Sequence, residues 1–257
     1  MRYSIAADVI FKNRDFVSHP LKKFLNTLYT NARIMNDSGI IEMIQTKSDG
    51  KLVDLGCDDG KLTVYLGKKM KSKNIWGVDV VTDRLKLAKK AGVNTINANI
   101  EDNFPLKDDS VDVVTANQVI EHVTNLDHFV SEIYRILKPG GYTIISTENA
   151  SSWCNIFASI MGWQIFSLTN FSAKKWGLGN PIALHQDDQS IYKEWTHKTI
   201  LNISGLAALL KLYGFDIVEV RGAGYFPLPN SLGNLDKTHS HFMTFKARKT
   251  KSKKLRE

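Results

Sequence analysis

Short apolar runs alternate with longer amphipathic stretches along the middle of this chain. Five of the runs predict strands, at 52–55, 74–79, 95–98, 111–116 and 143–146. The stretches between them carry apolar residues at helical spacing, as at Leu62, Tyr65 and Leu66. Because strands that alternate with helices form parallel sheets covered on both faces, the pattern predicts a doubly wound α/β fold. A helix at 200–213 and strands at 215–220 and 241–247 complete a mostly parallel seven-stranded sheet.

Three regions depart from this alternation. Residues 1–48 carry apolar positions at helical spacing and predict N-terminal helices. Residues 148–198 interrupt the pattern after the fifth strand and are rich in aromatic residues: Trp153, Phe157, Trp163, Phe166, Phe171, Trp176, Tyr192 and Trp195. Two interpretations stay open for this insertion, a wall of a substrate pocket or a small satellite core. The expected domains are therefore 1–48, a domain at 49–248 that includes the insertion, and a basic tail at 249–257.

A glycine turn follows the first predicted strand. Asp54 ends the apolar run, and Gly56 and Gly60 stand four residues apart before a helical pattern. Glycine turns sharply and lets the backbone approach a ligand. The second strand ends in another acid, Asp79, where a carboxylate accepts hydrogen bonds from both hydroxyls of a ribose. Together these features predict a cofactor that contains adenosine.

The residues of the turn discriminate between cofactors. A dinucleotide site has glycines at the positions that Asp58 and Lys61 occupy here. Two acids, Asp58 and Asp59, would also repel a pyrophosphate, whereas they suit a cationic ligand. S-adenosylmethionine (SAM) carries a sulfonium and an ammonium, so the local charge favours SAM.

The same segments resemble, in order, the motifs of the class I SAM-dependent methyltransferases. The resemblance covers about residues 45–147 and includes the turn 53–60, the acid Asp79, the segment 99–112, the run 117–123 and the turn 137–141. The segments 151–162 and 225–229 are similar to bacterial and archaeal methyltransferases of the type 11 and type 23 kind, whose substrate is unassigned. Two residues depart from the family pattern, because Asp58 replaces its central glycine and Asn99 its usual acid near the adenine.

The resemblance implies a role for each cofactor-binding residue, with S-adenosylhomocysteine (SAH) as the product. Asp54 would hold the turn or meet the ammonium, and Asp79 would bind the ribose. The residues of the turn would face the amino-acid end of the cofactor: Gly56, Cys57, Asp58 and Gly60. Those beside the adenine would be Val80, Asn99 and Ile100, and Asn117 would close the methionine side.

The segment after the fourth strand holds the candidate catalytic residues. His122 titrates near neutral pH and is a candidate general base toward an acceptor hydroxyl, with Glu121 orienting it or binding a metal. Some O-methyltransferases of quinone rings and of RNA 3′ ends carry Glu-x-x-Glu-His here and bind a divalent cation. This chain has Gln118 at the first position, a poorer ligand for a hard cation, so we expect no metal, although His185 or His197 would be available to complete a site. The alternative is that His122 only lines the pocket.

Composition adds limits on partners and compartment. The net charge is +8, and the stretch 246–256 holds seven Lys or Arg and no acid. This tail is either a solvated terminus or a contact for nucleic acid or an anionic membrane surface. No run of eighteen apolar residues predicts a membrane span. The two cysteines, Cys57 and Cys154, are expected to be reduced thiols of a cytoplasmic protein.

Three functions follow from the sequence. The first is SAM-dependent methylation, at oxygen, of a small-molecule substrate or a glycan- or lipid-linked acceptor. The second is methylation of RNA or protein, to which the basic tail points. The third is a non-catalytic SAM-binding protein, to which Asp58 and Asn99 point.

Overall fold

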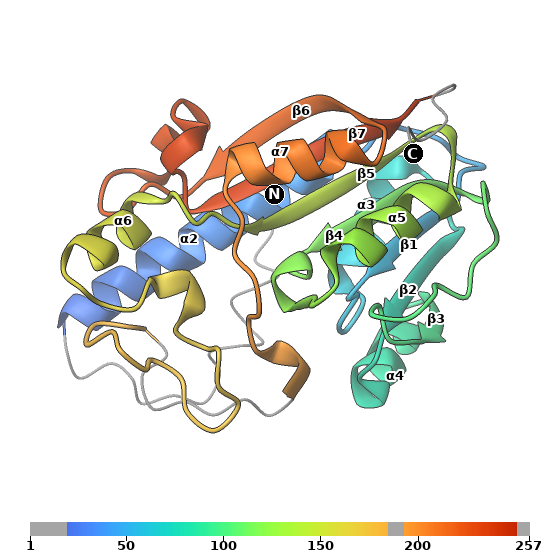
Figure 1. Ribbon diagram of the computed structural model, residues 1–257. Helices are drawn as coiled ribbons and strands as arrows, with labels where there is room; N and C mark the ends of the chain where they lie inside the picture. The colour runs from blue at the N-terminus through green and yellow to red at the C-terminus, as the bar shows by residue number, and fades with distance from the viewer. Residues whose placement is uncertain (1–19, 185–192, 251–257) are drawn as a thin grey trace. The chain divides into compact units, whose positions relative to one another are not determined.

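The computed structural model describes residues 20–184 and 193–250, and its main feature is a seven-stranded sheet (Figure 1). The strand order is β3-β2-β1-β4-β5-β7-β6. The strands are β1 (Leu52–Leu55), β2 (Ile75–Asp79), β3 (Asn94–Asn97), β4 (Val111–Asn117), β5 (Leu137–Glu148), β6 (Phe215–Ala223) and β7 (Phe242–Lys249). The expected α/β fold with seven strands is thus confirmed.

Strand β7 runs antiparallel to its neighbour β5. The pairs β1–β2, β1–β4, β2–β3 and β4–β5 are parallel. At one end of β7 the N–H of Asn149, just after β5, donates to His241 O at 2.9 Å. At the other end Lys249 Nζ donates to the carbonyl oxygen of Leu137, the first residue of β5, at 2.8 Å. The sheet is therefore mostly parallel with an antiparallel edge.

Helices fill most of the connections, as the hydrophobic spacing predicts. They are α2 (Pro20–Met43), α3 (Lys61–Met70), α4 (Thr82–Lys90), α5 (Leu126–Ile136), α6 (Trp153–Ile160) and α7 (Ile203–Leu212). Short 3₁₀ turns are η1 (Ile120–His122), η2 (Phe166–Leu168), η3 (Lys193–Trp195), η4 (Asn230–Asn234) and η5 (Lys237–His239). The expected helices of 1–48 correspond to α2 within the described residues, and residues 1–19 lie outside them.

The chain divides into two compact units, and each is described by itself. Within the described residues, the sheet unit comprises 39–147, 204–220 and 244–250, and the insert unit comprises 20–38, 148–184, 193–203 and 221–243. The insertion after β5 thus belongs to the same unit as part of α2 and a segment near the C-terminus. The domain boundaries expected from the sequence stay a prediction.

Each unit has its own apolar core. In the sheet unit, helix α3 and the end of α2 pack on the sheet through fully or nearly fully buried side chains, among them Ile40, Met43, Leu52, Leu66, Met70 and Val113. In the insert unit Ala32, Ala223 and Phe242 form a smaller cluster, against which Tyr29, Met35 and Phe226 pack. Within the described residues, none of the helices is both long enough and apolar enough to cross a membrane.

Candidate cofactor and active site

The turn between β1 and α3 has a left-handed backbone at three positions. Gly56, Asp58 and Gly60 have φ angles of 66°, 49° and 75°. Asp is one of the few residues with a side chain that tolerates this conformation, so the turn persists where Asp58 replaces a glycine. A Cβ on Gly56 would lie 2.6 Å from Val119 Cγ2, and one on Gly60 would lie 2.8 Å from Ala88 Cα. Close contacts within the protein therefore require both glycines, in addition to any contact with a ligand.

Asp54 is buried beneath this turn, with only 3% of its surface exposed. The hydroxyl of Thr63 on α3 donates to Asp54 Oδ2, and that of Thr115 on β4 donates to Oδ1, both at 2.6 Å. Asp54 therefore connects β1 to α3 and β4. Of the two roles expected for Asp54, this geometry favours holding the turn. Sequence reasoning missed Thr63 and Thr115, whose only signal is a hydroxyl at a position that the apolar pattern predicts to be buried.

Asp79 ends β2 and faces the same turn. Its Oδ2 accepts the N–H of Asp58 at 3.0 Å, and its Oδ1 accepts the N–H of Val81 at 2.9 Å. Burial raises the pKa of the Asp79 carboxyl, while these backbone donors act in the opposite direction. The N–H of Val80 is a third backbone donor to this carboxylate, whose two oxygens have four lone pairs in all, so capacity for a further donor remains. Val81 holds the N-cap position of α4 without a side-chain bond, and the Asp79 carboxylate accepts its N–H.

The charges around the turn differ from those that the sequence predicted. Arg84 on α4 donates two hydrogen bonds to the Asp58 carboxylate and lies 3.7 Å from Asp59 Oδ2. Lys61 Nζ lies 2.9 Å from the same Asp59 oxygen. Two cations of the protein therefore compensate the two acids. The net negative charge inferred from Asp58 and Asp59 is largely absent, and their charge alone does not select a cationic cofactor.

The residues expected beside the adenine lie after β2 and β3. The Val80 side chain is 42% exposed at the end of β2, and Asn99 and Ile100 lie in the loop after β3. Asn97, which the sequence did not single out, donates from its side chain to the Val80 carbonyl at 3.1 Å. Asn99 Oδ1 accepts the N–H of Glu101 at 3.1 Å. The loop is thus held by its own amide side chains, with the apolar surface of Val80 open beside it.

The candidate catalytic residues follow β4 in the sheet unit. Glu121 is 1% exposed, and its Oε2 accepts the Thr147 hydroxyl at 2.8 Å. His122 is half-buried in the same short turn η1. Gln118 has a left-handed φ of 58°, its N–H donates to Ser146 O at 2.8 Å, and its Nε2 is buried without a partner among the described residues. Asn117, half-buried at the end of β4, directly precedes this strained residue.

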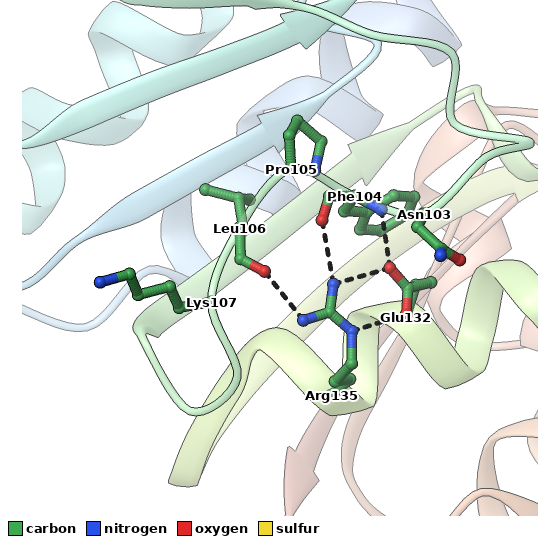
Figure 2. A pocket seen from close by; sticks show the side chains of 7 residues that line it. All are labelled: Asn103, Phe104, Pro105, Leu106, Lys107, Glu132 and Arg135. Atoms are coloured by element: carbon green, nitrogen blue, oxygen red, sulfur yellow. Dashed lines mark hydrogen bonds and ion pairs between the residues drawn. The ribbon is translucent and has the colours of Figure 1, made fainter.

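The loop between β3 and β4 is fixed by one guanidinium group (Figure 2). Arg135 on α5 donates to the carbonyl oxygens of Phe104 and Leu106 at 3.0 and 2.8 Å. It also binds Asp108 Oδ1 at 2.6 Å and both oxygens of Glu132 at 2.6 and 2.7 Å. Figure 2 shows the carbonyl oxygens of Phe104 and Leu106 and the Glu132 carboxylate turned toward Arg135 at a surface pocket, whereas Lys107 points away from it. The five N–H donors of the guanidinium are therefore all used within the protein, and the pocket is a structural feature of the loop.

Glu101 connects the loop after β3 to the loop after η1. Its carboxylate accepts the N–H of Thr124 at 2.8 Å and that of Asn125 at 3.3 Å. The loop that carries Asn99 and Ile100 and the segment that follows His122 are thus joined directly.

Several residues that were singled out from the sequence lie in the insert unit or outside the described residues. Trp153 begins α6, Phe166 lies in η2 and Trp195 in η3, whereas Tyr192 and His185 lie outside the described residues. His197 Nδ1 lies 2.6 Å from the carbonyl oxygen of Ser167 in the same unit.

Comparisons with known proteins agree with the fold. Residues 53–145 match the family described as "Methyltransferase domain". The mitochondrial ubiquinone biosynthesis O-methyltransferase of Rattus norvegicus is 28% identical over 135 residues, 49% of this chain and 39% of that protein. The ubiquinone biosynthesis O-methyltransferase of Cupriavidus pinatubonensis is 26% identical over 199 residues, 74% of this chain and 70% of that protein. The chain thus spans less than half the length of the rat relative.

Among solved structures, a SAM-dependent methyltransferase from Methanosarcina mazei matches with a TM-score of 0.58 at 18% identity, over 83% of this chain and 98% of the other. One from Mesorhizobium loti matches with a TM-score of 0.56 at 17% identity, over 86% of this chain and 100% of the other. These likenesses show the fold. The match at 53–145, the motifs found in the sequence and the fold thus identify a methyltransferase domain in this chain, similar to those of the SAM-dependent methyltransferases.

Proposed function

We propose that this protein transfers a methyl group from SAM to an oxygen atom of a small-molecule or glycan- or lipid-linked acceptor. The observation that carries the proposal is the Asp79 carboxylate, fixed by backbone donors at the end of β2 with capacity left for a further donor. The relatives in rat and Cupriavidus pinatubonensis are named O-methyltransferases, which supports oxygen as the acceptor atom.

The residues around the turn fit the cofactor. We assign the ribose hydroxyls to Asp79 and one face of the adenine to the exposed side chain of Val80, with Asn99 and Ile100 at its edge. We assign the amino-acid end to the backbone of the turn 56–60 and to Asn117. Cys57 is 5% exposed, and burial raises the pKa of its thiol, so it contributes as a neutral packing group. Gly77 allows this packing, since a Cβ there would lie 2.5 Å from the Cys57 sulfur.

The chemistry required of the chain is proton removal and positioning. When bound, SAM supplies an activated methyl group, so the protein has to orient an acceptor hydroxyl in line with it and take up the hydroxyl proton. We assign the proton to His122, which is more accessible than the buried Glu121. Glu121, held by the Thr147 hydroxyl, is assigned to orienting the adjacent turn. We propose no metal, because Gln118 stands where a carboxylate ligand would be needed.

The experiment that tests this function is incubation of the protein with SAM labelled in the methyl group and with fractionated cell extract. Label in a small-molecule, glycan or lipid fraction is expected. Base hydrolysis of the product then distinguishes a methyl ester from a methyl ether. Label that enters only RNA or protein would overturn the proposal in favour of the second function. Calorimetric binding of SAM and SAH without turnover on any fraction would favour a non-catalytic protein instead.

We further propose that the reaction takes place in the cytoplasm. Cys57 and Cys154 are both free thiols, and burial raises the pKa of the Cys154 thiol to about 12. Unpaired cysteines suit a reducing compartment. Fractionation of cells that express the tagged chain tests the assignment.

A further inference from the structure

An exposed apolar face covers part of the insert unit. Four large side chains of α6 and the residue after it recur at helical spacing and face solvent, Trp153, Phe157, Ile160 and Met161, with Ile160 78% exposed. Two more exposed side chains come from the segment 225–239, Leu228 at 51% and Leu235 at 84%. Single exposed apolar residues are ordinary, but a contiguous group marks an interaction surface.

A polar network joins α6 to the segment 225–239, which contains the short turns η4 and η5. The Trp153 ring stacks on His239, with centroids 4.4 Å apart, and its indole hydrogen-bonds the Tyr225 hydroxyl. That hydroxyl donates to Asp236 Oδ2 at 2.6 Å, and His239 Nδ1 lies 2.8 Å from the same oxygen. Trp153 is thus fixed at its polar edge while 42% of the residue stays exposed. We call these six apolar residues and their network the α6 face.

The charged residues of the segment that carries α6 are all positive. Residues 149–184 contain no Asp or Glu, and they carry Lys174 and Lys175, both exposed. Lys237, also exposed, lies two residues from His239 in η5. Asp236, the acid of this segment, is engaged by Tyr225 and His239. Exposed apolar side chains on a segment whose charged residues are lysines, with Lys237 close to their network, are complementary to an anionic lipid interface, where lysines meet headgroups and apolar side chains enter the acyl region.

We propose that the α6 face binds the protein to the surface of an anionic phospholipid bilayer. A Trp held by its polar edge with an exposed apolar ring suits the headgroup level of a membrane. Ile160, Met161 and Leu235 supply the apolar area that inserts. The binding is peripheral, since the helix α6 has eight residues and is far too short to span a bilayer.

Co-sedimentation of the full chain with vesicles tests this proposal. Vesicles of phosphatidylcholine with phosphatidylglycerol are expected to sediment the protein, and pure phosphatidylcholine vesicles to sediment much less of it. The double variant Ile160→Gln and Leu235→Gln should lower the partition coefficient by about tenfold or more, because two exposed apolar side chains no longer leave water. Leu212→Gln in the sheet unit, where Leu212 is 71% exposed, is the matched control and should bind as the unchanged protein does. Thermal unfolding confirms that the variants are folded.

Three results would overturn the proposal. The first is no sedimentation of the unchanged protein with anionic vesicles at low salt. The second is an equal loss of binding in Leu212→Gln and in the double variant. The third is a dimer in analytical ultracentrifugation that the double variant abolishes, with vesicle binding unaffected, which would assign the α6 face to a second copy of the chain.

Discussion

The backbone N–H of Asp58 donates to the carboxylate of Asp79 across 3.0 Å, which joins the turn after β1 to the end of β2. The acid assigned to the ribose therefore also fixes the turn assigned to the amino-acid end of the cofactor. Removal of Asp79 would affect both ends of the cofactor at once.

We expect Asp79→Ala to weaken SAH binding by about 1–3 kcal/mol, the cost of leaving buried hydrogen-bonding groups without partners. Isothermal titration calorimetry measures the change. Asp83→Ala is the control, because the Asp83 side chain lies on the neighbouring helix α4 and is 76% exposed. Unchanged affinity in Asp79→Ala would show that the ribose binds elsewhere.

Replacement of Arg84 tests how the charge of the turn acts on the cofactor. Arg84→Ala leaves the Asp58 carboxylate without its partner, so the affinity ratio of SAM to SAH should rise by about twofold to fivefold at low salt, since only SAM carries the sulfonium charge. The increase should shrink as salt screens the charges. Lys86→Ala, an exposed cation on the same helix, should leave the ratio unchanged. A constant ratio in Arg84→Ala would mean that the charge of the turn does not contribute to selection of the cofactor.

Stability at acid pH should depend on Glu132. The hydrogen bonds from Arg135 lower the pKa of the Glu132 carboxyl below its ordinary value of 4.5. A depressed pKa in the folded state stabilises the protein above pH 4.5, and this contribution is lost as the pH falls through the folded value. Glu132→Gln should therefore lower the free energy of unfolding by about 1–3 kcal/mol at neutral pH and by much less at about pH 3.5. Urea unfolding at the two pH values measures the difference, and an equal loss at both would exclude the ionised pair as its cause.

The role of His122 is testable apart from cofactor binding. With the acceptor found by the labelling experiment, His122→Ala should lower kcat by about 10²–10⁴-fold, the usual contribution of general base catalysis, while SAH affinity stays within about twofold. His128→Ala on α5 is the control and should keep its activity. A small loss of kcat with a raised KM would instead show that His122 only lines the pocket.

The strands were predictable where hydrophobic pattern and pairing agree. Strand β1 has the predicted bounds, Leu52–Leu55, and β4 extends one residue beyond the prediction. Strand β5 is much longer than expected, because Val111 pairs with Leu137 before the Gly140-Gly141 pair that was interpreted as a turn. The register shifts between Val111 and Val113, which accommodates the glycines within the strand.

The site was predictable in its residues but only partly in their roles. Asp79 and the glycine turn were predicted from local spacing alone. The compensation of Asp58 by Arg84 was not, because the partner lies 26 residues away and only the packing of α4 brings it to the turn. In the same way, Thr115 reaches Asp54 across 61 residues of sequence. Such partners have no signal in the spacing of a single sequence.

The close approach of Val119 to Gly56 restricts how the candidate site can diversify. Val119 stands three residues before His122, where a new acceptor would ordinarily be accommodated by changing side-chain volume. A bulkier residue at position 119 would clash with the turn at Gly56. It would thereby distort the turn that is assigned to the cofactor. Changes that accommodate a different acceptor are therefore expected to leave this junction unaltered.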